Sequence, residues 1–270
     1  MGRKIGLFAT LVSIHAVLAG FDLASAESLV IAASPSLAAP LEALSHAFES
    51  THPDIRVQIY FDNGLDLRRT VVAMENSMIG QYFIEKGPIH LLAPGGDELI
   101  TRLEQKYYIL PGTRRAYAQE RLVVVVPEAL VEAPSSLEEL VRDKTKRVAI
   151  ADPTGTVLGQ QTMSALQSPG VVEILKGRLD IASDAKGVLD HLLSGQADAG
   201  IMFGHDAIKE QERVRVVAVV GGRYAPTVHS MAMERYCPNR KLCEEFLAFI
   251  QSSDAQKVLK QVGYGVPGGQ

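Results

Sequence analysis

The sequence predicts an α/β fold made of two similar lobes. Short apolar segments typical of buried strands alternate with segments of helical periodicity along nearly the whole 270-residue chain. This alternation is typical of βαβ units and parallel sheets. The strand–helix series begins near residue 28 and begins again near residue 122, so we expect two lobes rather than one. The strands also end in polar loops that lead into helices, and open α/β sheets bind ligands at such junctions.

The first series is expected to contain three strands and three helices. Leu41, Leu44 and Phe48 recur at the spacing of one helix face, whereas Val57 and Ile59 alternate as in a half-buried strand. We expect strands at residues 28–33, 56–60 and 89–93, and helices at residues 37–50, 65–74 and 97–105.

The second series opens with a β-branched run that ends at Pro127. Ser135 or Ser136 can cap the helix that follows, and Glu138 or Glu139 can complete a capping box. We expect strands at residues 122–126, 147–151, 199–203 and 215–220, and helices ending at residue 141 and spanning residues 159–166, 186–194, 239–252 and 255–262.

The two series imply a division of the mature chain into lobes. Lobe one is expected to comprise residues 27–120 plus 229–270, and lobe two residues 121–228. The chain would then cross between the lobes twice, near residues 120–122 and again near residues 224–229.

The N-terminus has the pattern of a secretory signal peptide. Arg3 and Lys4 precede an uncharged, mostly apolar run at residues 5–18, and small residues occupy positions 24–26. The run is shorter than the 18 or more residues of a membrane-spanning helix, and no cysteine follows position 26 at once to carry a lipid anchor. We therefore expect residues 1–26 to be cleaved and the mature protein to be exported to the periplasm.

Composition and cysteine content narrow the function further. A net charge of −4 without a basic block argues against binding to nucleic acid. Cys237 and Cys243 both lie in the exported part, where the surroundings are usually oxidising, so a structural disulfide is expected. A metal pair is less favoured because no histidine stands nearby at ligand spacing.

Several stretches resemble the molybdate-binding proteins of bacterial ABC importers, over essentially all of the mature chain. The resemblance is carried by residues 30–37, 120–127, 148–153, 200–207 and 262–264. It implies a type II periplasmic-binding fold, with two lobes, a two-strand hinge and a cleft that captures a tetrahedral oxyanion, molybdate or tungstate. It also implies delivery to a membrane permease, a monomeric protein, no cofactor and no enzymatic activity.

The resemblance also suggests which residues bind the anion. Ser36 matches the first serine ligand and stands just before a helix, where free N–H groups and a partial positive charge favour anions. The second serine position falls at Asn63 and Gly64, beside Asp62. Two ligands that act through backbone N–H groups fall on Leu158 and Ala185.

The last family ligand, a tyrosine, falls on Phe203. Phenylalanine cannot donate, and the missing hydrogen bond corresponds to roughly 1.5–3 kcal/mol of binding free energy. His90 and His205 are the histidines nearest to the expected cleft. We expect each to hydrogen-bond locally, although either could replace the lost donor if it faced the cleft. Pro35 reshapes the first loop, because proline has no N–H.

Three alternatives remain open. A hydrolase would need a triad such as Ser36, His90 and Asp62, but no Gly-x-Ser-x-Gly elbow surrounds any serine. The same scaffold could bind a different small anion or an organic acid, which the departures at Asn63 and Phe203 would allow. It could also serve as a sensory or interaction module that has lost its ligand.

Overall fold

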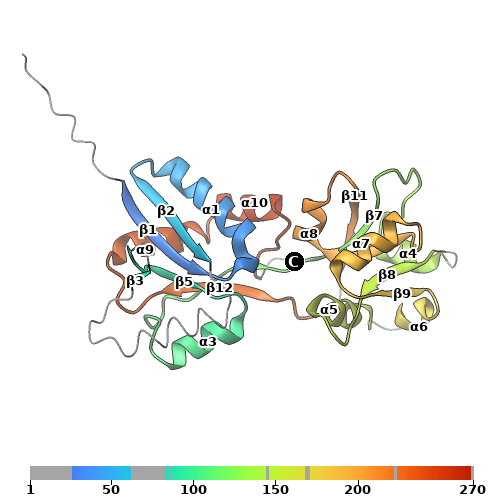
Figure 1. The fold of residues 1–270 in the computed structure, drawn as a ribbon, viewed down its shortest axis with the longest axis horizontal. Coiled ribbons are helices and arrows are strands. Elements are labelled where there is room, and N and C mark those ends of the chain that lie inside the picture. Colours follow the sequence, from blue (N-terminus) through green and yellow to red (C-terminus); the bar gives the residue numbers. More distant parts are fainter. Residues whose placement is uncertain are drawn as a thin grey trace, which may run out of the picture.

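The structure is a computed structural model that describes residues 26–61, 83–84, 87–143, 146–167, 171–221 and 224–268. It contains two five-stranded sheets, each packed against its own helices. Figure 1 shows two globular parts joined at a narrow waist. Among the described residues, none of the helices has the length and apolar character needed to cross a membrane.

The first sheet has the strand order β2-β1-β5-β12-β6. Its strands are β1 (Glu27–Ala33), β2 (Ile55–Phe61), β5 (Leu91–Ala93), β6 (Arg115–Gln119) and β12 (Val228–Met233). Strands β2 and β5 lie parallel to β1, so the three strands end together at Phe61, Ala33 and Ala93. Strand β12 runs antiparallel to both β5 and β6, so this sheet is mixed, with parallel βαβ units only among β1, β2 and β5.

Helices cover this first sheet and bury its apolar side chains. They are the short 3-10 helix η1 (Pro35–Leu37), α1 (Ala38–Thr51), α3 (Asp97–Gln105), α9 (Arg240–Phe249) and α10 (Ser253–Gln261). Leu41, Leu44 and Phe48 of α1 are fully buried, as their helical spacing predicted. The ring of Phe48 meets Phe246 of α9 edge-on at 5.0 Å, which ties the C-terminal helices to the N-terminal part of this lobe.

The second sheet has the strand order β11-β7-β10-β8-β9. Its strands are β7 (Leu122–Pro127), β8 (Val148–Ala151), β9 (Leu179–Ala182), β10 (Ala199–Phe203) and β11 (Val214–Val219). Strands β8, β9 and β10 are parallel, whereas β7 runs antiparallel to β10 and β11. The helices of this part are α4 (Leu137–Arg142), α5 (Val157–Leu166), α6 (Val171–Leu175), α7 (Ala185–Leu193) and α8 (Gly204–Lys209).

The structure shows which serine caps α4 and which glutamate is its partner. Ser136 is the N-cap, and its hydroxyl accepts a hydrogen bond from the Glu139 N–H at 3.1 Å. The Glu139 carboxylate reaches back to the N–H of Ser135 at 2.7 Å, one residue before the cap. Ser136 and Glu139 therefore form a variant of the capping box, in which the glutamate reaches the residue before the cap.

Strands β6 and β12, which lead into the two expected crossings, were not predicted from the sequence. Strands β6 and β12 pair side by side as far as Gln119 and Val228, and the Glu120 N–H continues this pairing by donating to the Thr227 carbonyl at 2.9 Å. Strand β9 and helices α6 and α8 were also not predicted. The helix expected at residues 65–74 lies outside the described residues. The lobe boundaries given above stay a proposal.

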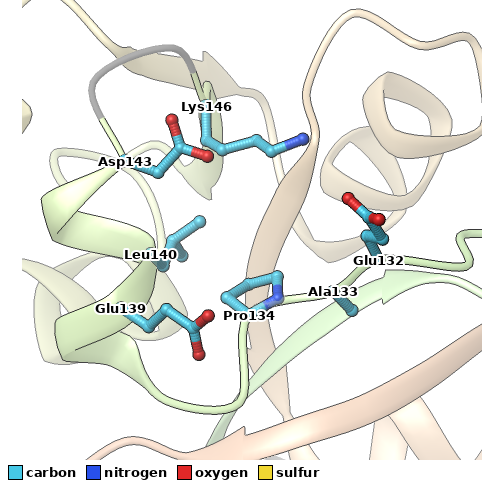
Figure 2. Close-up of a pocket in the computed structure, with 7 residues that line it drawn as sticks. All are labelled: Glu132, Ala133, Pro134, Glu139, Leu140, Asp143 and Lys146. Atoms are coloured by element: carbon cyan, nitrogen blue, oxygen red, sulfur yellow. The ribbon is translucent and has the colours of Figure 1, made fainter.

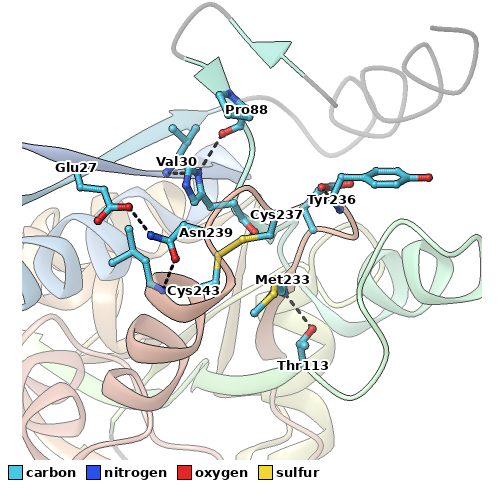
Figure 3. Close-up of a disulfide and its surroundings, with 12 residues drawn as sticks. Glu27, Val30, Pro88, Thr113, Met233, Tyr236, Cys237, Asn239 and Cys243 are labelled. Atoms are coloured by element: carbon cyan, nitrogen blue, oxygen red, sulfur yellow. Dashed lines mark hydrogen bonds between the residues drawn. A yellow bond between two sulfur atoms is a disulfide. The ribbon is translucent and has the colours of Figure 1, made fainter. Parts of the chain in front are cut away.

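The structure joins Cys237 to Cys243 at the start of α9 (Figure 3). Both cysteines are buried, and Asn239 between them caps α9 by accepting from the Leu242 N–H at 3.1 Å. The bond thus ties the turn after β12 to the first residues of the helix.

We predict that this disulfide forms in the exported protein. Labelling of free thiols in unreduced, purified protein should modify neither cysteine, whereas two labelled thiols per chain would contradict the prediction. Replacement of both cysteines by serine should lower the free energy of unfolding by about 2 kcal/mol, the loss expected for so short a loop. Urea unfolding of the wild type and the double variant measures this difference.

Candidate functional site

Two serines stand together where β1 ends. The Ser34 N–H donates to the Ala93 carbonyl of β5 at 3.1 Å, and the hydroxyl oxygens of Ser34 and Ser36 are 3.0 Å apart. Gly95 covers this pair with a φ of +77°, and a side chain there would place its Cβ 3.2 Å from that of Ser34. The paired hydroxyls are therefore held at the carboxyl edge of the first sheet, just before α1. The Ser36 side chain is exposed and can reach a ligand.

Helix α5 presents its N-terminus where β8 ends. Thr156 caps the helix by accepting from the Gly159 N–H at 2.9 Å. A Cβ on Gly159 would lie 2.4 Å from the carbonyl oxygen of Ala151, so glycine allows the helix to begin directly on the strand. Leu158 lies in this first turn, where backbone N–H groups have no partner within the helix. Gln161 of the same helix donates to Thr227 at 2.7 Å, which ties α5 to the crossing segment.

Helix α7 begins at Ala185, and a carboxylate already caps it. Asp184 accepts from the Gly187 N–H at 2.8 Å. The sequence reading of Ala185 as an anion-binding position did not take this acidic cap into account. The Ala185 N–H belongs to the first turn and has no partner within the helix, but an anion there would lie near a negative charge. Asp152, at the end of β8, is likewise turned to its own loop and accepts from the Thr154 N–H at 2.8 Å.

Phe203 ends β10 and lies at the junction between the lobes. Its ring stacks on that of His205 with 5.7 Å between the centroids. The other neighbour of His205 is Tyr264, stacked at 5.0 Å and an angle of 13°. The Tyr264 hydroxyl in turn lies 3.5 Å from the Ser36 carbonyl oxygen, to which it donates. Three rings thus connect Phe203 in the second sheet to the Ser36 loop in the first.

The structure brings together only some of the proposed ligand residues. Ser36 and Phe203 are linked through the rings just described. Leu158 and Ala185 lie at helix starts of the second sheet, and no hydrogen bond among the described residues connects them to Ser36. Asn63 and Gly64, with Asp62, lie outside the described residues.

A buried carboxylate at the waist was missed by sequence reasoning. Glu120 follows β6 and accepts a hydrogen bond from His229 Nε2 at 3.0 Å, and its other oxygen lies 2.9 Å from His205 Nδ1, at ion-pair distance. Burial alone would raise the pKa of Glu120, but the contacts with the two histidines lower it to about 2. The signal available in the sequence was a charged residue just before the strand expected at residues 122–126, at the point where the chain was expected to cross.

His205 is the pivot of this cluster. Its second ring nitrogen, Nε2, lies 3.3 Å from Asp206 Oδ1. Burial alone would lower the pKa of His205, but hydrogen bonds to Asp206 and Glu120 raise it to about 9. Because both ring nitrogens face carboxylates, His205 has no free N–H with which to replace the donor absent from Phe203.

His90 lies inside the first sheet and not at the junction. Its Nδ1 is 3.2 Å from the Val30 nitrogen and 3.1 Å from the Pro88 oxygen, and burial lowers the pKa of the ring. Both histidines thus contact neighbouring protein groups, as expected from the sequence, His90 beside Val30 and Pro88 and His205 beside Glu120 and Asp206.

A separate pocket of about 280 Å³ opens in the second lobe (Figure 2). Its lining consists of Glu132, Ala133, Pro134, Glu139, Leu140, Asp143 and Lys146. The pocket lies beside the start of β8, at the end of the sheet opposite to the helix N-termini. Lys146 pairs with Asp198 at 3.7 Å, so the three carboxylates of the lining make the pocket unsuited to an anion. In the described part of the chain, no group of three or more His, Cys, Asp or Glu side chains could hold a metal ion.

Curated relatives are similar to this chain over nearly its whole length. The molybdate-binding protein ModA of Escherichia coli is 24% identical over 271 residues, which cover 98% of this chain and 100% of that protein. The molybdate-binding protein ModA of Haemophilus influenzae is 23% identical over 250 residues, with 91% and 92% covered.

Solved structures confirm the two-lobe α/β fold of type II periplasmic-binding proteins. The substrate-binding domain assigned to a molybdenum ABC transporter of Clostridium difficile has a TM-score of 0.73 at 19% identity, and the match covers 88% of this chain and 98% of that one. The fold is also shared by iron-bound HitA of Pseudomonas aeruginosa and the sulfate-binding protein SubI of Mycobacterium tuberculosis, with TM-scores of 0.54 and 0.51.

The family assignment rests on a match to most of the chain. Residues 29–265 match the family described as bacterial extracellular solute-binding protein. The relatives are solute-binding proteins as well, so the prediction that this chain is not an enzyme is confirmed. This chain belongs to the bacterial extracellular solute-binding protein family.

Proposed function

We propose that the protein captures a tetrahedral oxyanion, molybdate or tungstate, between its two lobes and delivers it to the permease of an ABC importer. The observation that carries this proposal is the Ser34–Ser36 hydroxyl pair at the carboxyl edge of the first sheet, directly before η1 and α1. Hydroxyl and backbone donors at such an edge suit an anion. The molybdate-binding relatives support the choice of anion.

The proposed donors are Ser36, Asn63 or Gly64, and the backbone N–H groups of Leu158 and Ala185. Phe203 lines the junction without donating. The Asp152 carboxylate leaves the start of α5 to an anion, because it is turned to its own loop, whereas the Asp184 cap makes Ala185 the least favourable of the proposed donors. No cofactor takes part, and the protein acts as a monomer without nucleic acid.

The proposed site of action is the periplasm. The basic start, the apolar run and the small residues at positions 24–26 support export and cleavage, and the family is extracellular by description. Residues 1–25 lie outside the described part of the chain.

A different small anion is the second candidate, and Phe203 favours it. The family's tyrosine donor is absent there, and His205 does not replace it. Sulfate or a small organic acid would then be the solute. Thermal shift with a panel of molybdate, tungstate, sulfate, phosphate and small carboxylates separates the candidates, because a ligand stabilises only a fold that binds it. No shift with any anion in ligand-free protein would contradict both candidates and favour a sensory or interaction module.

Two substitutions test the proposed donors. Ser36→Ala should weaken molybdate binding by about 1–2 kcal/mol, the scale of one lost hydrogen bond. Phe203→Tyr should hold or raise the affinity for molybdate, provided that the ring keeps its orientation, because the variant gains the hydroxyl donor that the family has at this position. Calorimetry on both variants measures the change.

Ser50→Ala is the matched control for Ser36→Ala. The Ser50 hydroxyl donates to the Ala47 carbonyl at the far end of α1, so its loss should leave molybdate affinity unchanged. If Ser36→Ala and Ser50→Ala bind molybdate with equal affinity, Ser36 is not a ligand of the anion.

A further inference from the structure

The two lobes meet through side chains at the waist as well as through the crossing backbone. Glu120 lies in the first crossing segment, His229 ends the second as part of β12, and His205 projects from α8 of the second lobe. The Glu120 carboxylate accepts from the His229 ring and lies at ion-pair distance, 2.9 Å, from the His205 ring, and its side chain is only 12% exposed. One buried carboxylate therefore connects both crossing segments to the first turn of α8.

The two histidines that contact Glu120 differ in where they carry their protons. The Gly96 N–H donates to His229 Nδ1 at 3.2 Å, so the proton that His229 gives to Glu120 is carried on Nε2. His205 lies between two carboxylates, Glu120 and Asp206, and must carry a proton on each ring nitrogen to satisfy both. The bond between the lobes is therefore an ion pair between Glu120 and a charged His205.

The C-terminal segment links this ion pair to the proposed anion site. Tyr264 stacks on His205 and lies edge-on to His229 at 6.1 Å, and its hydroxyl donates to the Ser36 carbonyl. A displacement of the His205 ring would remove the surface on which Tyr264 packs, and Tyr264 supports the Ser36 loop.

We propose that His205 is a positioning residue for anion binding, which holds α8 of lobe two against Glu120 and Tyr264 and thereby fixes the Ser36 loop. Loss of one His205 proton would leave a lone pair facing a carboxylate, Glu120 or Asp206, and would break one of the two contacts. The high pKa of His205, about 9, is consistent with a ring that stays charged at neutral pH. His205 therefore holds the Ser36 loop in place below about pH 9, and this effect is lost as the pH rises through the pKa of His205.

Within the described ranges, charged and titratable groups from four segments face His205. They are Glu120 from the crossing segment, Asp206 from α8 with Lys209 3.8 Å from it, His229 from β12, and Tyr264 from the C-terminal segment. Burial raises the pKa of Tyr264, so Tyr264 stays protonated while His205 titrates. Molybdate remains a dianion throughout this range, and its own charge does not change.

Calorimetry with molybdate from pH 7 to pH 10 tests the proposal. This affinity test rests on the proposed function, because it requires that the protein binds molybdate. The wild-type affinity should fall by about tenfold as His205 loses its proton, the effect of one charge-assisted hydrogen bond. Asp206→Asn should move the midpoint of this fall down by roughly one pH unit, because a carboxylate that favours the charged ring is removed. His205→Gln should show weaker binding at pH 7 and no such fall.

Glu210→Gln is the matched control. It removes the same charge four residues after Asp206, from a carboxylate that pairs with Arg213 at 3.0 Å, and should leave the midpoint in place. A fall whose midpoint is equal in the wild type and in Asp206→Asn, or no fall at all, would overturn the proposal.

A second readout needs no ligand and separates this proposal from the proposed function. Small-angle scattering of ligand-free protein should show a change in the arrangement of the lobes above pH 9 in the wild type, and none in His205→Gln. If no variant binds any anion but this change is seen, the proposed function fails while the link between the lobes stands. If scattering is independent of pH in the wild type, the positioning role of His205 fails.

Discussion

The Gly263→Ala variant is expected to lose about 3 kcal/mol of its free energy of unfolding, from backbone strain and overpacking together. Gly263 has a φ of +86°, in the region that disfavours a side chain, and an added Cβ would lie 2.4 Å from the carbonyl carbon of Gly204. The atoms in the way belong to the backbone at the start of α8, so they cannot turn aside. The methyl group should push the second lobe away from the C-terminal segment.

Two further glycines separate the causes of this loss. Gly195→Ala carries the same strain, with a φ of +75°, but an added Cβ there meets nothing within 4 Å, so only about 1 kcal/mol should be lost. Gly204→Ala carries the clash, with its Cβ 2.4 Å from the Gly263 oxygen, and should lie between the other two. Urea unfolding of the three variants gives the order. A loss in Gly263→Ala no greater than in Gly195→Ala would show that the close approach does not exist in solution.

The parts of the fold that the sequence predicted are those specified by local pattern. Leu41, Leu44 and Phe48 mark α1 by their spacing, and β7 contains four consecutive valines. Caps are local as well, and Ser136 and Glu139 stand three residues apart, as a capping box requires. Strands β6 and β12 were missed because Arg115–Gln119 and Val228–Met233 lack an apolar run, and pairing with partners distant in the chain makes them strands.

The candidate site divides in the same way. Ser36 was proposed from the resemblance to the molybdate-binding proteins and from its place just before a helix, and both can be read from neighbouring residues. The contact between Glu120 and His229 joins residues 109 positions apart in the chain, and no local sequence pattern around either residue predicts it. The acidic cap of α7 was visible as Asp184 in the sequence but acquires its meaning only when the helix is seen to begin at Ala185. The antiparallel direction of β7 and β12 likewise depends on how the chain returns between the lobes.

The Glu234→Gln variant is expected to be more stable than the wild type at pH 8, by about 2–3 kcal/mol, and equal to it near pH 4.5. Glu234 is 2% exposed, and its Oε2 accepts from the Tyr236 N–H at 2.5 Å. Its Oε1 has no hydrogen-bond partner in the described part of the chain. Burial raises the pKa of this carboxyl from 4.5 to about 7, against the opposing effect of the N–H groups of Tyr236 and Arg235.

The sign follows from the direction of this shift. A carboxyl whose pKa is raised on folding favours the folded state most when both states are protonated, below about pH 4.5, and this contribution is lost as the pH rises to about 7. Glutamine keeps an oxygen that can accept from the Tyr236 N–H but cannot ionise, so the variant does not lose stability as the pH rises. Urea unfolding at pH 4.5, 6 and 8 should show a difference that grows across this window. Glu244→Gln, at an exposed position of α9, is the control. A stability difference for Glu234→Gln that is constant with pH would mean that the Glu234 carboxyl is not buried in solution.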